Sequence, residues 1–285
     1  MSPKTVSTGT YNFLYIPIIL PRTLVKRFLP PSVSSISPSP FWDSSAIQND
    51  CGLRLSENDH VVVFQIGRQY KTGTWIAKFD FQEAKLEIPY LNHPALDPSS
   101  TGRFPFLFKQ TVMFDSSLMK YASRYIVGLR SLLTKNDPWN FPEPIDKYNS
   151  TEIQRGEIVD ILKLEVQYGT KDSDSESARL WTSEIFQKMF SQPFYGEFSN
   201  GVHKMEGDFA KPLQPISTFS GSIAIKLSAF ELTSDGEHLD PEELSRHNCG
   251  LDDDGWLRIS SELLGYHAKV NITINGPFQP SHFSS

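Results

Sequence analysis

The sequence predicts a mainly β fold of the β-rich α+β type, with few helices and with curved antiparallel sheets around a barrel-like cavity. Over residues 75–82, apolar residues alternate with mostly polar ones, as expected of a strand with one apolar face. The same alternation recurs over 158–168, 223–229 and 266–274. One-sided strands of this kind need antiparallel sheets wrapped around a shared core. The 20 Phe, 10 Tyr and 5 Trp residues suit a wide apolar interior.

The elements can be assigned in chain order. The apolar run 13–20 is expected to form a buried first strand, and 24–29 a helix that stops at the prolines after it. A strand over 61–70 is expected to pair with 75–82 through a turn at 71–73. Further helices are expected over 116–122, 182–189 and 241–247.

Composition excludes several classes of function. The chain has 285 residues without a domain-scale linker, so residues 1–285 are expected to form a single domain. The net charge of −6 provides no basic field for phosphates, so neither nucleic acid nor a membrane surface is an expected partner. No signal peptide is recognisable and Cys51 and Cys249 are too isolated for a disulfide scaffold, which indicates a cytoplasmic protein. No cofactor fingerprint or metal-ligand spacing is present, so no cofactor and no metal are predicted.

Two sets of residues carry a family resemblance. Phe64-Gln65-Ile66 together with Glu83, and the segment 123–131 containing Arg124 and Ser131, resemble the active-site framework of the acetoacetate decarboxylases. In that family the second segment reads roughly Gly-Arg-Glu-x-x-Gly-x-Pro-Lys, and its lysine forms a Schiff base with a ketoacid. Ser131 occupies the lysine's place here, and Gln65 replaces a family glutamate. The resemblance implies an acetoacetate decarboxylase-like fold, in a divergent member that lacks the Schiff-base lysine.

Glu83 is the strongest candidate for chemistry. It continues the alternation of Trp75, Phe79 and Phe81 along one strand, so its carboxylate should point to the same apolar interior. Burial should raise its pKa unless a cation or hydrogen-bond donor compensates. The alternative is a glutamate that faces solvent at the end of the strand.

The resemblance implies roles for other residues. Arg124 would hold a substrate oxygen, although an ion pair with Glu83 or Asp115 is an equal alternative. The predicted catalytic residues are Glu83, Arg124 and Gln65. The predicted substrate-binding residues are Tyr11, Phe64, Phe81, Trp75, Phe79, Arg130 and Ser131.

These residues predict an enzyme whose apolar cavity binds a carbonyl-bearing natural-product intermediate. It would act as a cyclase (including a pericyclase), an isomerase or a dehydratase, without Schiff-base catalysis. One alternative is a decarboxylase or aldolase-type lyase that uses another lysine, of which Lys135 is the nearest in sequence. A second alternative is a non-catalytic carrier of a small apolar molecule. The expected partner is an apolar small molecule, and the sequence leaves a homo-oligomer open.

Overall fold

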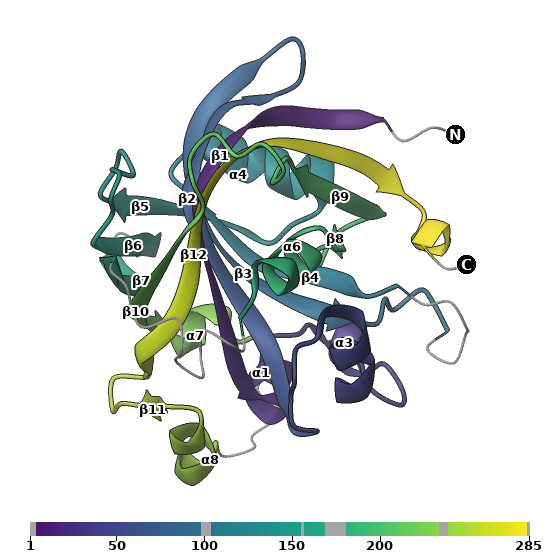
Figure 1. Ribbon diagram of the computed structural model, residues 1–285, viewed down its shortest axis with the longest axis vertical. Coiled ribbons are helices and arrows are strands. Elements are labelled where there is room, and N and C mark those ends of the chain that lie inside the picture. Colours follow the sequence, from purple (N-terminus) through teal and green to yellow (C-terminus); the bar gives the residue numbers. More distant parts are fainter. Residues whose placement is uncertain (1–3, 98–103, 155–156, 169–180, 234–238, 284–285) are drawn as a thin grey trace.

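In the part of the chain that the structure describes, twelve strands form one hydrogen-bonded sheet that curls back on itself (Figure 1). The computed structural model describes residues 4–97, 104–154, 157–168, 181–233 and 239–283. The strands are β1 (Thr5–Pro21), β2 (Asp59–Gly73), β3 (Lys78–Leu91), β4 (Phe106–Phe114), β5 (Ser131–Asp137), β6 (Lys147–Gln154), β7 (Glu157–Tyr168), β8 (Pro193–Tyr195), β9 (Val202–Gly207), β10 (Ser217–Lys226), β11 (Cys249–Leu251) and β12 (Trp256–Phe278).

The strand order closes into a ring. Neighbouring strands run in the order β1-β2-β3-β4-β5-β6-β7-β10-β12, and β12 also pairs with β1 over Thr5 to Tyr15. The mainly β prediction is confirmed. The sheet is not purely antiparallel, however, because β4 pairs in parallel with both β5 and β8.

Helices are short and lie outside the ladders. The four predicted helices are confirmed to within two residues at each end, and Asp240 caps the last one by accepting a hydrogen bond from the Glu242 N–H at 2.9 Å. Three further helices of four, eight and four residues, in the described part of the chain, were not predicted. The helices are α1 (Arg22–Arg27), α2 (Pro31–Ser34), α3 (Ser44–Cys51), α4 (Ser117–Ala122), α6 (Ser183–Phe190), α7 (Leu227–Phe230) and α8 (Pro241–Arg246); α4 continues into the π-helical turn η1 (Ser123–Val127), and η2 (Pro280–Phe283) is a 3₁₀ turn. None of the helices described is long and apolar enough to cross a membrane.

The sheet separates two apolar cores. The inner core fills the ring of strands and includes Phe64, Leu86 and Ile225, all fully buried. The outer core lies on the opposite face of β1 to β4 and β12, where Phe190 of α6 stacks on Phe13 with ring centroids 5.3 Å apart. Because both faces of these strands are covered, their residues are buried almost without interruption.

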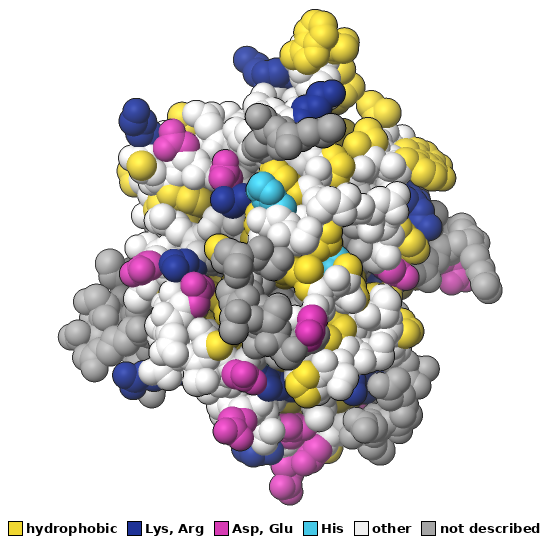
Figure 2. Space-filling view, turned by 90° about the vertical axis from the view of Figure 1, so that its right-hand side faces the viewer, with side chains coloured by type: hydrophobic (Ala, Val, Ile, Leu, Met, Phe, Trp, Pro, Cys, Tyr) yellow, Lys and Arg dark blue, Asp and Glu magenta, His cyan; other side chains and the backbone are white. Residues whose placement is uncertain are grey.

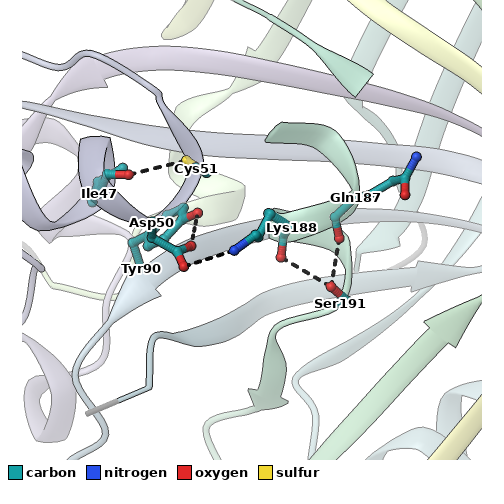
Figure 3. Close-up of polar contacts among 7 residues, drawn as sticks. All are labelled: Ile47, Asp50, Cys51, Tyr90, Gln187, Lys188 and Ser191. Atoms are coloured by element: carbon teal, nitrogen blue, oxygen red, sulfur yellow. Dashed lines mark hydrogen bonds and ion pairs between the residues drawn. The ribbon is translucent and has the colours of Figure 1, made fainter. Parts of the chain in front are cut away.

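Polar contacts join the outer helices to each other and to the sheet (Figure 3). Lys188 of α6 lies 3.3 Å from Asp50 of α3, and the Tyr90 hydroxyl of β3 donates to the other Asp50 oxygen at 2.9 Å. These contacts fix α3 and α6 over the outer core, beside the strands that carry the candidate site.

The hairpin between β2 and β3 differs from the prediction. β2 runs through the expected turn to Gly73, and the connection comprises residues 74–77. Trp75 therefore lies at the hairpin tip and is 91% exposed, so its predicted place on the interior face is wrong. Phe81 and Glu83 do share a face, and Gln82 points to the other one. Gln82 is nevertheless buried, because the segment after β5 covers it and Pro138 accepts its amide hydrogen bond.

Candidate active site

A cavity of about 290 Å³ lies on the outer face of the sheet. The β2–β3 hairpin bounds it on one side, α4 and η1 on another, and β8 and β9 complete its wall. The wall is mostly apolar and includes Phe81, Val112, Phe114, Met119, Leu129, Phe194 and Met205. Such a space suits a small apolar molecule with few polar groups.

Four polar side chains gather on the sheet side of this cavity. Lys85 Nζ lies 2.7 Å from Glu83 Oε1, and Gln69 Nε2 donates to the same oxygen at 2.7 Å. Lys109 Nζ lies 3.3 Å from Oε1 of Glu87, which is buried beside it. Gln69, Glu83, Lys85 and Lys109 line the cavity and are each at most 4% exposed. The site thus holds two lysine amines and two acidic side chains away from water.

Alternation along the strands explains three of these four positions. Glu83 and Lys85 are two residues apart on β3, so both side chains project from the same face. Gln69 of β2 pairs with Phe81 and therefore reaches Glu83 from the neighbouring strand.

Lys109 reaches the cavity through a β-bulge. In the β3–β4 ladder Leu86 faces Thr111 but Glu87 faces Lys109, so Gln110 is an extra residue in β4. Its amide donates to the Phe230 carbonyl in the inner core. In a regular strand Lys109, three residues before Val112, would point to the opposite face from Val112. The extra residue shifts the alternation by one, so both side chains line the cavity.

The charge of Glu83 is stabilised within the site. Burial would raise the pKa of Glu83, but the charges of Lys85 and Lys109 and the hydrogen bonds from Lys85 and Gln69 outweigh it and lower the pKa below its ordinary value. The exception foreseen from the sequence applies, and Glu83 is a carboxylate at neutral pH.

For Lys109, in contrast to Glu83, the surroundings disfavour the charged form. Burial, and then the positive charge of Lys85, lower the pKa of Lys109 to about 8, although Glu87 and Glu83 oppose that shift. The Nζ atom lies 3.9 Å from the ring centroid of Phe194, so one side of the amine faces an aromatic surface. About a tenth of Lys109 is therefore an uncharged amine at pH 7.

Tyr11 adds a neutral hydroxyl next to the charged groups. Its ring centroid lies 4.9 Å from Lys85 Nζ, and its hydroxyl is buried without a hydrogen-bond partner in the described part of the chain. Burial, followed by the negative charge of Glu83, raises the pKa of Tyr11 well above its usual range. Tyr11 is accordingly a hydroxyl donor and not a phenolate.

The structure brings only part of the predicted site together. Glu83, Phe79 and Phe81 line the cavity, and Tyr11 lies beside Lys85. Gln65 is buried opposite Lys85 on the same sheet face, but it does not reach the cavity wall.

The remaining predicted residues lie elsewhere. Phe64 belongs to the inner core, and the Arg130 guanidinium donates to Thr111 Oγ1 and to the Ala229 carbonyl, away from the cavity. Arg124 is exposed, with its guanidinium 4.2 Å from the Phe198 ring centroid. Ser131 is buried behind the wall, where its hydroxyl contacts Ser123 Oγ at 3.2 Å.

Three residues of the site were missed from the sequence. Gln69 and Lys85 carry the same alternation signal as Glu83, so extending that register would have found them. Lys109 carries no such signal, because the bulge is invisible in the sequence. The lysine weighed as a substitute, Lys135, is exposed on β5 and does not line the cavity. Among the described residues, no group of three His, Cys, Asp or Glu side chains could hold a metal ion.

Comparisons with known proteins agree with the fold. No protein-family model matches the sequence, and no curated protein gives a significant match. The solved structure of the enduracididine biosynthesis enzyme MppR complexed with pyruvate is similar, with a TM-score of 0.50 and 12% identity over 100% of this chain and 93% of that chain. An acetoacetate decarboxylase from Legionella pneumophila has a TM-score of 0.46 and 13% identity, over 96% of this chain and 86% of that one. The likeness to MppR shows a shared fold, and the mainly β architecture with few helices is as the sequence predicted.

Proposed function

We propose that this protein is an enzyme that binds a carbonyl-bearing small molecule in its apolar cavity and forms an imine through Lys109. One observation carries the proposal: a buried lysine with a lowered pKa lines the cavity beside a second lysine and a carboxylate. This corresponds to the alternative in which a lysine from another strand replaces the one missing at Ser131.

The lowered pKa supplies the reactive form of the amine. Only an uncharged amine attacks a carbonyl carbon, and burial next to another cation is an established way to favour that form. With a pKa of about 8, about a tenth of Lys109 is uncharged at pH 7, whereas less than about a thousandth of an ordinary lysine is.

The neighbouring groups suit the later steps. The Lys109 nitrogen would attack the carbonyl carbon and water would leave, which yields an imine. Once protonated, the imine accepts the electron pair of a bond broken at the adjacent carbon, from which either a proton or carbon dioxide leaves. The resulting enamine takes up a proton, and hydrolysis of the imine by water frees Lys109 and the carbonyl product. Glu83, held as a carboxylate by Lys85 and Gln69, is the proton acceptor in the same cavity.

The structural comparison supports a carbonyl ligand. MppR has a similar fold and has been crystallised with pyruvate. At 12% identity this likeness extends only to the fold, so the proposal depends on the residues of this chain.

A second candidate is non-covalent catalysis of cyclisation, isomerisation or dehydration. The ion pairs Lys85–Glu83 and Lys109–Glu87 favour it, because paired lysines are charged hydrogen-bond donors that polarise a carbonyl without bonding to it. A non-catalytic carrier of a small apolar molecule would need only the apolar cavity and not these charged groups.

Borohydride trapping separates covalent from non-covalent function. The protein is incubated with acetoacetate or pyruvate and sodium borohydride, and its intact mass is measured. We expect a stable adduct in the wild type and in Lys135→Arg, and none in Lys109→Arg, whose guanidinium does not form an imine. An absent adduct in the wild type, together with turnover of a carbonyl substrate, would favour the non-covalent candidate.

A further inference from the structure

The mouth of the cavity carries a concentration of exposed apolar side chains. At the tip of the β2–β3 hairpin, Trp75 is 91% exposed and Ile76 is 75% exposed. Across the mouth, η1 presents Tyr125 and Ile126, which are 78% and 67% exposed. We call the following residues the mouth patch: Trp75, Ile76, Leu118, Tyr121, Tyr125 and Ile126.

The mouth patch is continuous with the cavity. Leu118 and Ile126 belong both to the patch and to the cavity wall, and Thr74 and Ala77 line the cavity from the hairpin on either side of Trp75 and Ile76. The hairpin projects from the top of the molecule, where hydrophobic side chains gather in the space-filling view (Figure 2). A ligand that enters the cavity by this route must cross the apolar rim.

Basic side chains border the patch. Lys71 and Lys78 are exposed next to the tip of the hairpin, and Lys120 and Arg124 flank the tyrosines of α4 and η1. Figure 2 shows basic side chains beside the hydrophobic ones at the top of the molecule. Two carboxylates lie among them, Asp80, which accepts from the Lys71 N–H, and Asp115, which accepts from the Gln82 N–H. Lys71, Lys78, Lys120 and Arg124 outnumber these two carboxylates, so the surface around the mouth patch is more positive than the chain as a whole, which carries a net charge of −6.

The charge pattern decides between two kinds of occupant. A second copy seated on the same patch would place these lysines and arginine against their equivalents, which is unfavourable. An anionic surface complements them. Exposed tryptophan and tyrosine rings with lysine and arginine around them are the combination that binds at the headgroup level of a bilayer.

We propose that the mouth patch docks this protein onto anionic lipid membranes, with Trp75 and Ile76 inserted among the headgroups and the cavity mouth facing the lipid. No membrane partner was expected from the sequence, because the net charge of the whole chain is negative. That net charge does not reveal the basic side chains gathered around the mouth patch. An apolar ligand dissolved in the bilayer would then reach the cavity without crossing water. The docking does not depend on the reaction that the cavity carries out.

Vesicle binding tests the docking directly. Sedimentation is measured with vesicles of phosphatidylcholine alone and of phosphatidylcholine with phosphatidylserine. The wild type should bind the anionic vesicles, more weakly as salt rises and hardly at all to the neutral ones. Replacing Lys71 or Lys78 by Glu should weaken binding by at least about fivefold for each unit of positive charge removed. Trp75→Ala should weaken binding as well.

Matched variants control for general surface effects. Trp139 is 74% exposed and Ile158 is 69% exposed, both outside the mouth patch, so Trp139→Ala and Ile158→Ser should bind as the wild type does. Circular dichroism confirms that each variant is folded. The proposal is overturned if the wild type does not bind anionic vesicles, or if Trp75→Ala and Trp139→Ala bind them equally. It is also overturned if the wild type self-associates without binding lipid and Trp75→Ala abolishes that self-association.

Discussion

Lys85 Nζ lies 2.7 Å from Glu83 Oε1, and both side chains are buried on one face of β3. Their spacing of two residues along a strand fixes this contact. The pair has two effects on the cavity: it keeps Glu83 ionised, and the charge of Lys85 lowers the pKa of Lys109. The chemistry proposed for Lys109 therefore depends on a lysine that need not react itself.

Breaking the pair should destabilise the protein. In Glu83→Gln the Lys85 ammonium loses its partner in a buried site, which should lower the free energy of unfolding by about 3 kcal/mol. The double variant Glu83→Gln with Lys85→Met should lose less than the sum of the single losses, because no unpaired charge remains. Urea unfolding measures the free energy of unfolding of Glu83→Gln, of Lys85→Met and of the double variant. Additive losses would show that the two groups do not interact.

Activity should separate Glu83 from Ser131. If the Glu83 carboxylate transfers a proton, Glu83→Gln should lower kcat/KM by roughly 10² to 10⁴. Ser131→Ala removes a buried hydroxyl behind the cavity wall, so it should cost about 1 kcal/mol of stability and leave the rate near that of the wild type. Steady-state kinetics and urea unfolding measure the two effects. A wild-type rate in Glu83→Gln would exclude Glu83 as the proton acceptor.

Acid should destabilise the protein through His60. Its Nε2–H donates to the Pro89 carbonyl at 2.8 Å, and burial lowers the pKa of His60 to about 3. The unfolded chain, with an ordinary histidine pKa of about 6.5, binds a proton that the folded state excludes. Stability from this residue is therefore complete above pH 6.5 and decreases as the pH falls toward 3, by about 2 kcal/mol at pH 5.

Urea unfolding at pH 7 and at pH 5 tests this dependence. The loss of stability between the two values should be smaller in His60→Gln than in the wild type. The exposed His282 provides a control, because His282→Gln should preserve the full loss. Equal losses in the wild type and in His60→Gln would contradict the role given to His60.

The fold was predictable where side chains alternate without interruption. Residues 266–274 kept the expected register, since Ala268, Val270 and Ile272 are buried in β12. The alternation over 75–82 also located Glu83 correctly, but it included Trp75, because an apolar residue in a hairpin connection cannot be distinguished from one in a strand by periodicity.

The candidate site was predictable only in part. Motif spacing directed attention to Arg124 and Ser131, which the structure places outside the cavity. Lys109 was missed because a bulge, set by the pairing of β3 with β4, turns it toward the cavity. Pairing between distant strands leaves no local mark in the sequence, so this lysine could be found only from the structure.

The most direct test of the proposed chemistry is to locate the trapped residue. After borohydride reduction with acetoacetate, the protein is digested and the modified peptide identified by mass spectrometry over a range of pH. We predict that the modification maps to Lys109. Its yield should rise with pH along a titration curve whose midpoint lies near 8, the pKa of that amine. A modification on Lys85 or Lys135, or no modification at any pH, would contradict the account.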